Sequence, residues 1–217
     1  MQPNQLIYDF LQALVRNNRK EWMDANRNWY FEARGAVTEF FDPILLELKS
    51  IDPRIVQQSA KEGLNRINNN LMFHPDRPVY KNHFGIGFGF GKGLADFYVE
   101  LGVEKDMIAG GLWHPASADL KKVRSEIAYE GVALHKILSN KAFQKQFELY
   151  TEDRLKTTPK GYAKDHEFIE LLRLKSIAAF EEVNHDFSLH HNFAAKVVAS
   201  YKALQPLLDF INRGLRD

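Results

Sequence analysis

The chain has 217 residues, of which 45% are hydrophobic and 26% are charged, and this composition excludes a disordered, collagen-like or coiled-coil chain. Its 29 Lys and Arg residues nearly balance its 28 Asp and Glu residues, so the formal net charge of +1 gives no global attraction to nucleic acid or to an anionic membrane. The absence of cysteine excludes a disulfide framework, a thiolate nucleophile and a zinc–thiolate site.

The sequence also lacks membrane and secretion signals. No stretch approaches the ~18 consecutive apolar residues that indicate a transmembrane helix. The N-terminus has neither the basic segment nor the apolar segment of a signal peptide. We therefore expect a soluble cytoplasmic protein.

The N-terminal region, up to about residue 50, shows the period of amphipathic helices. Apolar residues recur at steps of three, four and seven, which places them on one side of a helix. A polar break at residues 16–19 separates two such stretches. Asp42 and Pro43 interrupt the second stretch. They either begin a new short helix or kink the existing one, because Asp suits an N-cap and Pro suits the first helical position.

From about residue 64 to residue 113 the period falls to two, which is typical of strands with one buried face. Apolar residues alternate with glycine over residues 84–91, and a second alternation covers residues 96–103. A turn near residues 91–93 would join these two segments as antiparallel strands. Residues 107–113 predict a third strand and residues 65–73 a fourth, which gives the strand count of a stable sheet.

Helical periodicity returns after residue 115 and is clearest over residues 193–215, where Pro206 is expected to kink or split the helix. Helices, then strands, then helices, with no βαβ alternation, predict the α+β class. We expect one domain over residues 1–217, with an antiparallel meander sheet of about four strands covered by N-terminal and C-terminal helices.

The polar segment from residue 65 to residue 83 is the strongest candidate for a site. A strand here would place Arg66, Asn68 and Asn70 on one face, because alternate side chains of a strand point the same way. Two prolines stiffen the part that follows, which carries Asp76, Arg77, Tyr80, Lys81 and His83. Cations, a phenol and an imidazole on a stiff loop suit an anion or a phosphate. In the alternative interpretation, Tyr80 and Asp76 only hold the loop, and its cations are solvated.

Gly85, Gly87 and Gly89 leave one face of their predicted strand without side chains. Glycine in a strand often marks the close approach of a ligand or of another backbone. The bare face would either support a flat group beside Arg66 or lie under a tightly packed helix, and the sequence leaves both open.

Known catalytic and cofactor motifs are absent from the sequence. It contains no dinucleotide-binding glycine motif, P-loop, zinc-protease motif or serine-hydrolase motif. The densest histidine group (His185, Asp186, His190 and His191) lacks the spacing of metal ligands and is interpreted as structural or solvated. No metal and no cofactor is therefore expected.

Two later features bear on the candidate site. Trp113 follows a predicted strand and is either a core residue or the wall of a pocket. A basic run over residues 154–164 indicates a solvated loop or, alternatively, a phosphate or RNA contact. Lys175, at the end of a helical stripe, could direct its charge toward the same site as Arg66.

Several segments, in order along nearly the whole chain, resemble an uncharacterised family of bacterial and fungal proteins known as a conserved domain of unknown function. The family pattern R-I-x-R-D-x-R-F-S-K-D-K-x-P-Y-K-x-H aligns with residues 66–83, matching Arg66, Ile67, Phe73, Asp76, Tyr80, Lys81 and His83, with Arg77 in place of a Lys. Residues 110–115, 159–162, 165–166 and 171–175 match its further elements. The resemblance implies membership as one domain and brings no known activity.

This sequence departs from the family pattern in its charged row. Asn69 and Asn70 replace an Arg-Asp pair, and Met72 replaces an Arg. An amide cannot take a proton at neutral pH, so the change at Asn70 removes a potential base or metal ligand. The departures favour binding without catalysis.

We therefore expect a non-catalytic domain that binds a small anionic or phosphorylated ligand, or a protein partner. The alternative is an enzyme that acts on a phosphate- or carboxylate-bearing substrate, with Asp76, Tyr80 or His83 in acid–base roles. Neither nucleic acid nor a membrane is expected as a partner. The expected ligand-binding residues are Arg66, Asn68, Asn70, Arg77, Lys81, Trp113 and Lys175.

Overall fold

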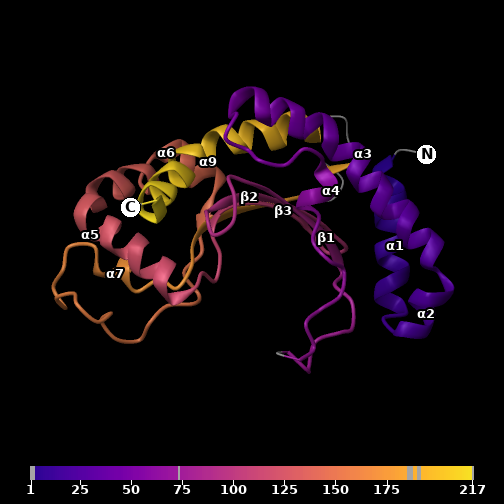
Figure 1. Ribbon diagram of the computed structural model, residues 1–217, viewed down its shortest axis with the longest axis horizontal. Coiled ribbons are helices and arrows are strands. Elements are labelled where there is room, and N and C mark those ends of the chain that lie inside the picture. Colours follow the sequence, from indigo (N-terminus) through magenta and orange to yellow (C-terminus); the bar gives the residue numbers. More distant parts are fainter. Residues whose placement is uncertain (1–2, 73, 185–187, 190–191, 217) are drawn as a thin grey trace. The chain divides into compact units, whose positions relative to one another are not determined.

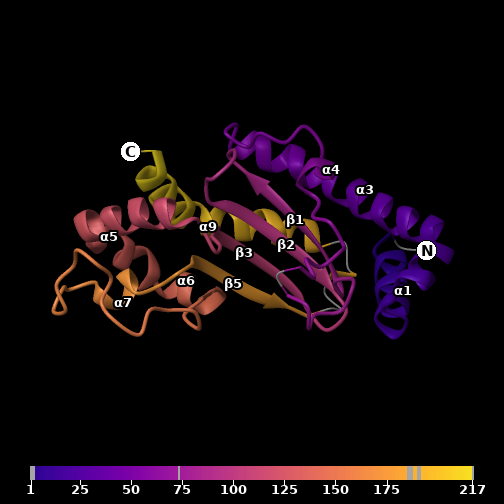
Figure 2. The ribbon, with the colours of Figure 1, turned by 60° about the horizontal axis from the view of Figure 1, so that its bottom comes forward.

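The computed structural model describes residues 3–72, 74–184, 188–189 and 192–216 (Figure 1). It combines helices with one open antiparallel sheet of five strands in the order β1-β2-β3-β5-β4 (Figure 2). The strands are β1 (His83–Gly89), β2 (Asp96–Gly102), β3 (Asp106–Leu112), β4 (Glu148–Leu149) and β5 (Ile177–Val183). The α+β class predicted from the sequence is confirmed.

Helices precede and follow the strands along the chain, as predicted. The N-terminal helices are α1 (Pro3–Arg16), α2 (Lys20–Ala25), α3 (Arg27–Ile51) and α4 (Ala60–Gly63). The later helices are α5 (Ser117–Leu138), α6 (Lys141–Gln146), α7 (Ile169–Leu172) and α9 (Phe193–Arg216). Among the described helices, none is long and apolar enough to cross a membrane.

The chain divides into two units, described separately below. The first comprises Met1–Phe88, Tyr98–Ile108 and Glu182–Val198, and the second comprises Gly89–Phe97, Ala109–Glu181 and Ala199–Asp217. The expectation of one domain over residues 1–217 stays a prediction.

In the first unit, the N-terminal helices cover the apolar face of β1. Helix α1 packs along α3. The rings of Phe10 and Phe84 lie 6.0 Å apart, and so do those of Phe41 and Phe88. Burial of such aromatic side chains is the main stabilising contribution to this unit. The opposite face of β1, which carries His83 and Gly85, does not contribute to this core.

In the second unit, α9 covers the apolar face of the strands. The rings of Phe97 and Tyr201 meet edge to face at 5.3 Å. A Cβ atom on Gly110 would lie 3.2 Å from Leu204, so the missing side chain lets α9 approach β3 closely. The apolar stripe of residues 193–215 therefore has the packing role that its helical period predicted.

The two prolines that were expected to interrupt helices, Pro43 and Pro206, lie inside helices and split neither of them. Helix α3 continues through Pro43, and α9 continues through Pro206. Asp42 does not cap a new helix, because its carboxylate Oδ1 accepts a hydrogen bond from the Ala60 backbone N–H at 2.7 Å. Packing against the sheet outweighs the loss of one helical hydrogen bond at each proline.

One predicted strand was wrong, and the observed strands β4 and β5 were not predicted. Residues 65–72 of the predicted strand 65–73 are not a strand of the sheet, and their only ladder contact among the described residues is an isolated bridge between Asn68 and Tyr80; Phe73 lies outside the described residues. No strand was predicted after residue 113, whereas β5 lies between β3 and β4 in the sheet. Strand β5 pairs with β4 through Glu148 with Phe180 and Leu149 with Ala179.

Candidate functional site

The polar segment forms an irregular hairpin, which we call the 64–81 hairpin, in the first unit. Its arms are joined by the Lys81 N–H donating to the Ile67 carbonyl at 2.8 Å and the Asn69 N–H donating to the Val79 carbonyl at 3.0 Å. The Asn69 side chain donates to the Pro78 carbonyl at 2.9 Å. Asparagine side chains that bond to nearby backbone compete with a regular strand, which explains the failed strand prediction.

Asn18 anchors the second arm of this hairpin to the helical region. Its side-chain amide donates to the Tyr80 carbonyl at 2.9 Å and accepts from the Tyr80 N–H at 2.9 Å. The Tyr80 side chain is only 4% exposed. Asp76, in contrast, is exposed in the loop between the arms. Tyr80 is therefore a core residue, and the joint role expected for Asp76, Tyr80 and His83 stays a prediction.

His83 instead meets two residues of β2, and we call His83, Tyr98 and Glu100 the polar cluster. His83 Nε2 lies 3.4 Å from Glu100 Oε2, and the Tyr98 hydroxyl donates to the same oxygen at 3.0 Å. The side chains of His83 and Glu100 are 22% and 21% exposed. The cluster is therefore reachable from solvent while it is shielded enough to shift proton equilibria.

Burial sets the charge states in this cluster. Burial, together with the smaller effect of the positive charge of Lys81, lowers the pKa of His83 to about 4. Burial raises the pKa of Glu100, against the opposing effects of the Tyr98 hydrogen bond and the charge of Lys81. At neutral pH the imidazole is therefore neutral, and it lies beside a carboxylate and an ammonium group.

Three cations of the hairpin, Arg66, Arg77 and Lys81, form what we call the cation cluster. Burial lowers the pKa of Lys81; the charge of Glu100 opposes this, and those of Arg66 and Arg77 add to it. Both arginines are exposed, and Lys81 is half-buried. Within the described part of the chain, none of the three forms a salt bridge. Positive charges thus lie near one another, and Glu100, whose charge acts on Lys81, forms no salt bridge with them among the described residues. Asn68 and Asn70 are exposed on the same hairpin.

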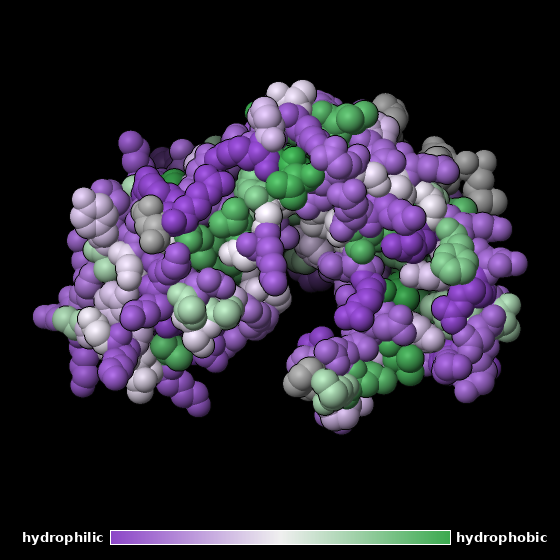
Figure 3. Space-filling model, in the orientation of Figure 1, coloured by the Kyte–Doolittle hydropathy of each residue, from purple (hydrophilic) through white to green (hydrophobic). Residues whose placement is uncertain are grey.

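The end of the hairpin exposes both apolar and polar side chains to solvent. Met72 is 78% exposed and Leu71 is 36% exposed. Figure 3 shows apolar green and polar purple surface side by side on this loop. The loop thus offers both apolar and charged groups to solvent.

The glycine row is covered by different groups at Gly85 and at Gly87. A Cβ atom on Gly85 would lie 2.7 Å from Tyr98 Cζ and still closer to the hydroxyl oxygen, so the tyrosine ring covers this glycine. At Gly87, the neighbour is Gly63 of α4, whose added Cβ would lie 3.2 Å from the Gly87 carbonyl carbon. The alternative of a tightly packed helix therefore holds at Gly87, where the helix is α4, whereas a cross-strand tyrosine covers Gly85.

Trp113 and Lys175 lie in the second unit, where the structure groups them with His114, Tyr150 and Asp153 as the Trp113 cluster. Trp113 is 56% exposed, so it is not a core residue. Lys175 Nζ lies 2.7 Å from Asp153 Oδ1, and His114 Nδ1 lies 3.7 Å from Asp153 Oδ2. The predicted ligand-binding residues therefore fall into two groups, one in each unit.

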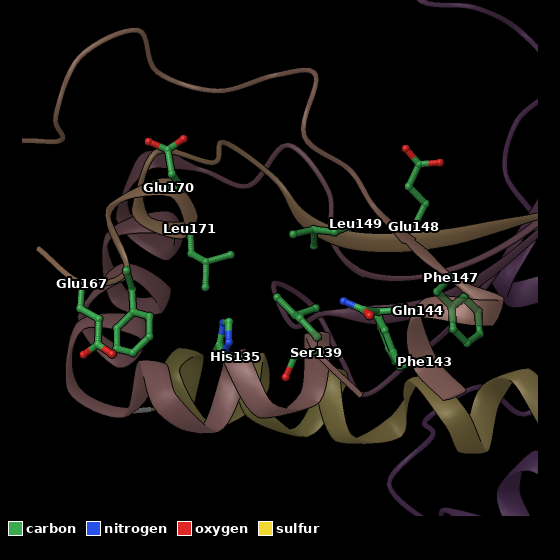
Figure 4. A pocket seen from close by; sticks show the side chains of 12 residues that line it. His135, Ser139, Phe143, Gln144, Phe147, Glu148, Leu149, Glu167, Glu170 and Leu171 are labelled. Atoms are coloured by element: carbon green, nitrogen blue, oxygen red, sulfur yellow. The ribbon is translucent and has the colours of Figure 1, made fainter. Parts of the chain in front are cut away.

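A separate cavity of about 700 Å³ lies in the second unit, away from every predicted site residue (Figure 4). Its walls come from α5, α6, β4 and α7, and Figure 4 shows Leu149 and Leu171 among the side chains that line it. Gly131 of α5 allows this geometry, because a Cβ there would lie 2.5 Å from Cε2 of the Phe168 ring, in the cavity wall, and still closer to its Cδ2. Exposed carboxylates stand at its rim on Glu148, Glu167 and Glu170.

The residues of the predicted histidine group, His185, Asp186, His190 and His191, lie outside the described residues. Among the residues that are described, no group of three or more His, Asp or Glu side chains could hold a metal ion.

Sequence reasoning missed Tyr98 and Glu100 as site residues. Their signal was present, since both belong to the polar side of the alternation over residues 96–103. A turn near residues 91–93 places that polar side next to the glycine side of β1. A large residue across from a glycine is the pattern that would have identified Tyr98.

Comparison with known proteins adds the family. A search of curated proteins finds no match. The family model described as conserved hypothetical protein (DUF2461) matches residues 7–210, and the chain therefore belongs to this family.

Proposed function

We propose that this chain binds a small anionic ligand, carrying a phosphate or a carboxylate, at the cation cluster of the 64–81 hairpin. The observation that carries the proposal is that burial and the nearby charges of Arg66 and Arg77 lower the pKa of half-buried Lys81, while none of the three cations forms a salt bridge among the described residues. Like charges held together repel, and a bound anion relieves that repulsion.

The chemistry of the three side chains suits a tetrahedral or planar anion. Guanidinium groups donate pairs of hydrogen bonds to phosphate or carboxylate oxygens, and an ammonium group adds a compact charge. The nearby polar cluster supplies a neutral imidazole on His83 and a carboxylate on Glu100. These groups would hydrogen-bond a hydroxyl or amine next to the anion, which favours a phosphorylated or carboxylated metabolite over an inorganic ion.

Acid–base catalysis is the second candidate, and the 3.4 Å separation of His83 Nε2 and Glu100 Oε2 is the observation that favours it. However, a histidine whose pKa lies at about 4 is a weak base at neutral pH. Asp76 is exposed on the loop, so the acid–base role would fall to Glu100, whose pKa burial raises. Binding without catalysis is therefore the function that the geometry supports best.

The test is a titration with inorganic phosphate, followed by calorimetry and by the melting temperature. Phosphate should stabilise the wild type by mass action. Lys81→Gln, and separately the double change of Arg66 and Arg77 to Gln, should each weaken binding about tenfold or more.

The matched control is Lys61→Gln, because Lys61 is an exposed cation of the same unit outside the cluster. It should bind phosphate as the wild type does. The proposal of an anion site would be contradicted if the control and the cluster variants bound phosphate equally well, or if the wild type did not bind phosphate.

A further inference from the structure

Trp113 is an exposed aromatic residue on a surface built to hold it in one position. Its ring lies 4.6 Å from the Tyr150 ring at 59° and 4.6 Å from the His114 ring at 77°. More than half of the side chain nevertheless stays in contact with solvent. A large aromatic surface that is fixed by neighbours and left open is typical of a place where a ligand stacks.

The backbone on both sides of Trp113 adopts positive φ angles. His114 has φ of +42°, the left-handed region that non-glycine residues rarely adopt. Its N–H donates to Ser176 Oγ at 2.9 Å, and Ser176 is fully buried. Gly111, two residues before the tryptophan, has φ of +144°, and a Cβ there would lie 2.5 Å from Ala178 Cα. Such strain persists only where the surroundings fix it, and it is common at binding sites.

A pair of opposite charges is held beside the aromatic rings. The Lys175 N–H donates to the Asp153 carbonyl at 3.1 Å, and Arg154 and Leu174 form an isolated bridge between the same two segments. This backbone pairing fixes the side chains of Lys175 and Asp153, which meet at 2.7 Å. They are 44% and 30% exposed, so their remaining hydrogen-bonding capacity faces solvent.

The combination defines the chemistry of the ligand. A sugar ring has an apolar face of C–H groups and a rim of hydroxyls that both donate and accept. With such a ring, Asp153 would accept from one hydroxyl, Lys175 would donate to the next, and the aromatic surface would cover the apolar face. The carboxylate and the ammonium group cancel in charge, which suits a neutral polyol better than a nucleotide, whose phosphates Asp153 would repel.

We propose that the Trp113 cluster is a carbohydrate-binding site that takes a neutral pyranose with neighbouring hydroxyl groups. The site lies in the second unit and uses none of the residues of the cation cluster. If the carbohydrate site is disproved, the proposed anion site is unaffected. If the anion site is disproved, the carbohydrate site is unaffected.

The test follows the indole N–H signals of the protein by ¹⁵N-resolved NMR. The chain has 3 tryptophans, and Trp113→Phe identifies the Trp113 signal by its loss. The probes are the methyl glycosides of glucose, galactose, mannose and N-acetylglucosamine, with AMP as a stacking competitor. At least one glycoside should move the Trp113 signal in a saturable manner and leave the signals of Trp22 and Trp29 in place.

Variants then assign the polar contacts by calorimetry with the glycoside that binds. Asp153→Asn and Lys175→Met should each weaken binding about tenfold, and Trp113→Ala should abolish it. Tyr129→Ala is the control, because Tyr129 is an aromatic residue of the same unit that is 83% exposed. The proposal is overturned if no glycoside moves the Trp113 signal, if only AMP does, or if Asp153→Asn and Lys175→Met bind as the wild type does.

Discussion

The phenol ring of Tyr98 occupies the space that a side chain at position 85 would need. A Cβ on Gly85 would lie 2.7 Å from Tyr98 Cζ and 2.9 Å from its Cε2. The same hydroxyl donates to Glu100 Oε2 at 3.0 Å, and that oxygen lies 3.4 Å from His83 Nε2. The absence of a side chain at Gly85 therefore lets Tyr98 hold the Glu100 carboxylate against His83.

Gly85→Ala should destabilise the protein by about 1–3 kcal/mol, because the added methyl group overlaps the Tyr98 ring. Urea denaturation measures the loss. Gly35→Ala is the control: Gly35 lies in α3 with nothing within 4 Å of an added Cβ, so this change should be neutral or stabilising. Equal effects of the two changes would contradict the account of Gly85. Tyr98→Ala in the Gly85→Ala protein should recover part of the loss.

Asn18→Ala should loosen the 64–81 hairpin, because it removes both hydrogen bonds that the side chain makes to the Tyr80 backbone. The expected cost is about 1–3 kcal/mol, since the Tyr80 N–H and carbonyl lose these partners. Amide hydrogen exchange at Tyr80 should accelerate. The side chain of the neighbouring Asn17 donates to the Ala13 carbonyl of α1 instead of to the hairpin, so Asn17→Ala is the matched comparison and should leave exchange at Tyr80 unchanged. Unaltered exchange in Asn18→Ala would show that the hairpin does not depend on this anchor.

His83 should make stability depend on pH in a known direction. Burial lowers its pKa from 6.5 to about 4, so the unfolded chain binds the proton more tightly than the folded chain between these values. The wild type should therefore lose stability as pH falls from 6.5 to 4, by up to about 1.4 kcal/mol per pH unit, relative to His83→Gln.

The comparison with His83→Gln at each pH is needed because Asp96 acts in the opposite direction. Burial raises the pKa of Asp96 to about 6, so its contribution to stability falls as pH rises toward that value. Denaturation curves of the two proteins at several pH values give the difference. A difference that does not change with pH would show that His83 titrates normally in the folded protein.

Much of the fold could be predicted from periodicity, and the failures have physical causes. The periodic sequence signal was strong for the helices before residue 50 and after residue 193 and for the β1–β2 hairpin, because one face of each element is buried. Strand β5 was missed because residues 177–179 are all buried and show no alternation, which periodicity alone cannot distinguish from a helix. Its partner β4 has only two residues and carries no strand pattern of its own.

The candidate site was only partly accessible from the sequence. Lys81, His83 and the cations of the hairpin were identified because polar groups were dense in one segment. The burial of Tyr80 was not predicted, because position in a chain does not show burial and its backbone partner Asn18 is 62 residues away. Glu100 was not predicted as a site residue, because its role depends on His83, which lies across from it on the neighbouring strand. The grouping of Lys175 with Trp113 needed the pairing of two loops that lie far apart in the sequence.

The most direct measurement of the central claim is the pKa of Lys81, followed by NMR of its side chain with and without saturating sulfate, which stays a dianion throughout the titration. Burial and neighbouring charges lower this pKa in the free protein. An anion held by the cation cluster favours the charged ammonium group, so sulfate should raise the pKa by about one unit for each tenfold preference. An identical pKa with and without sulfate would contradict anion binding at this site.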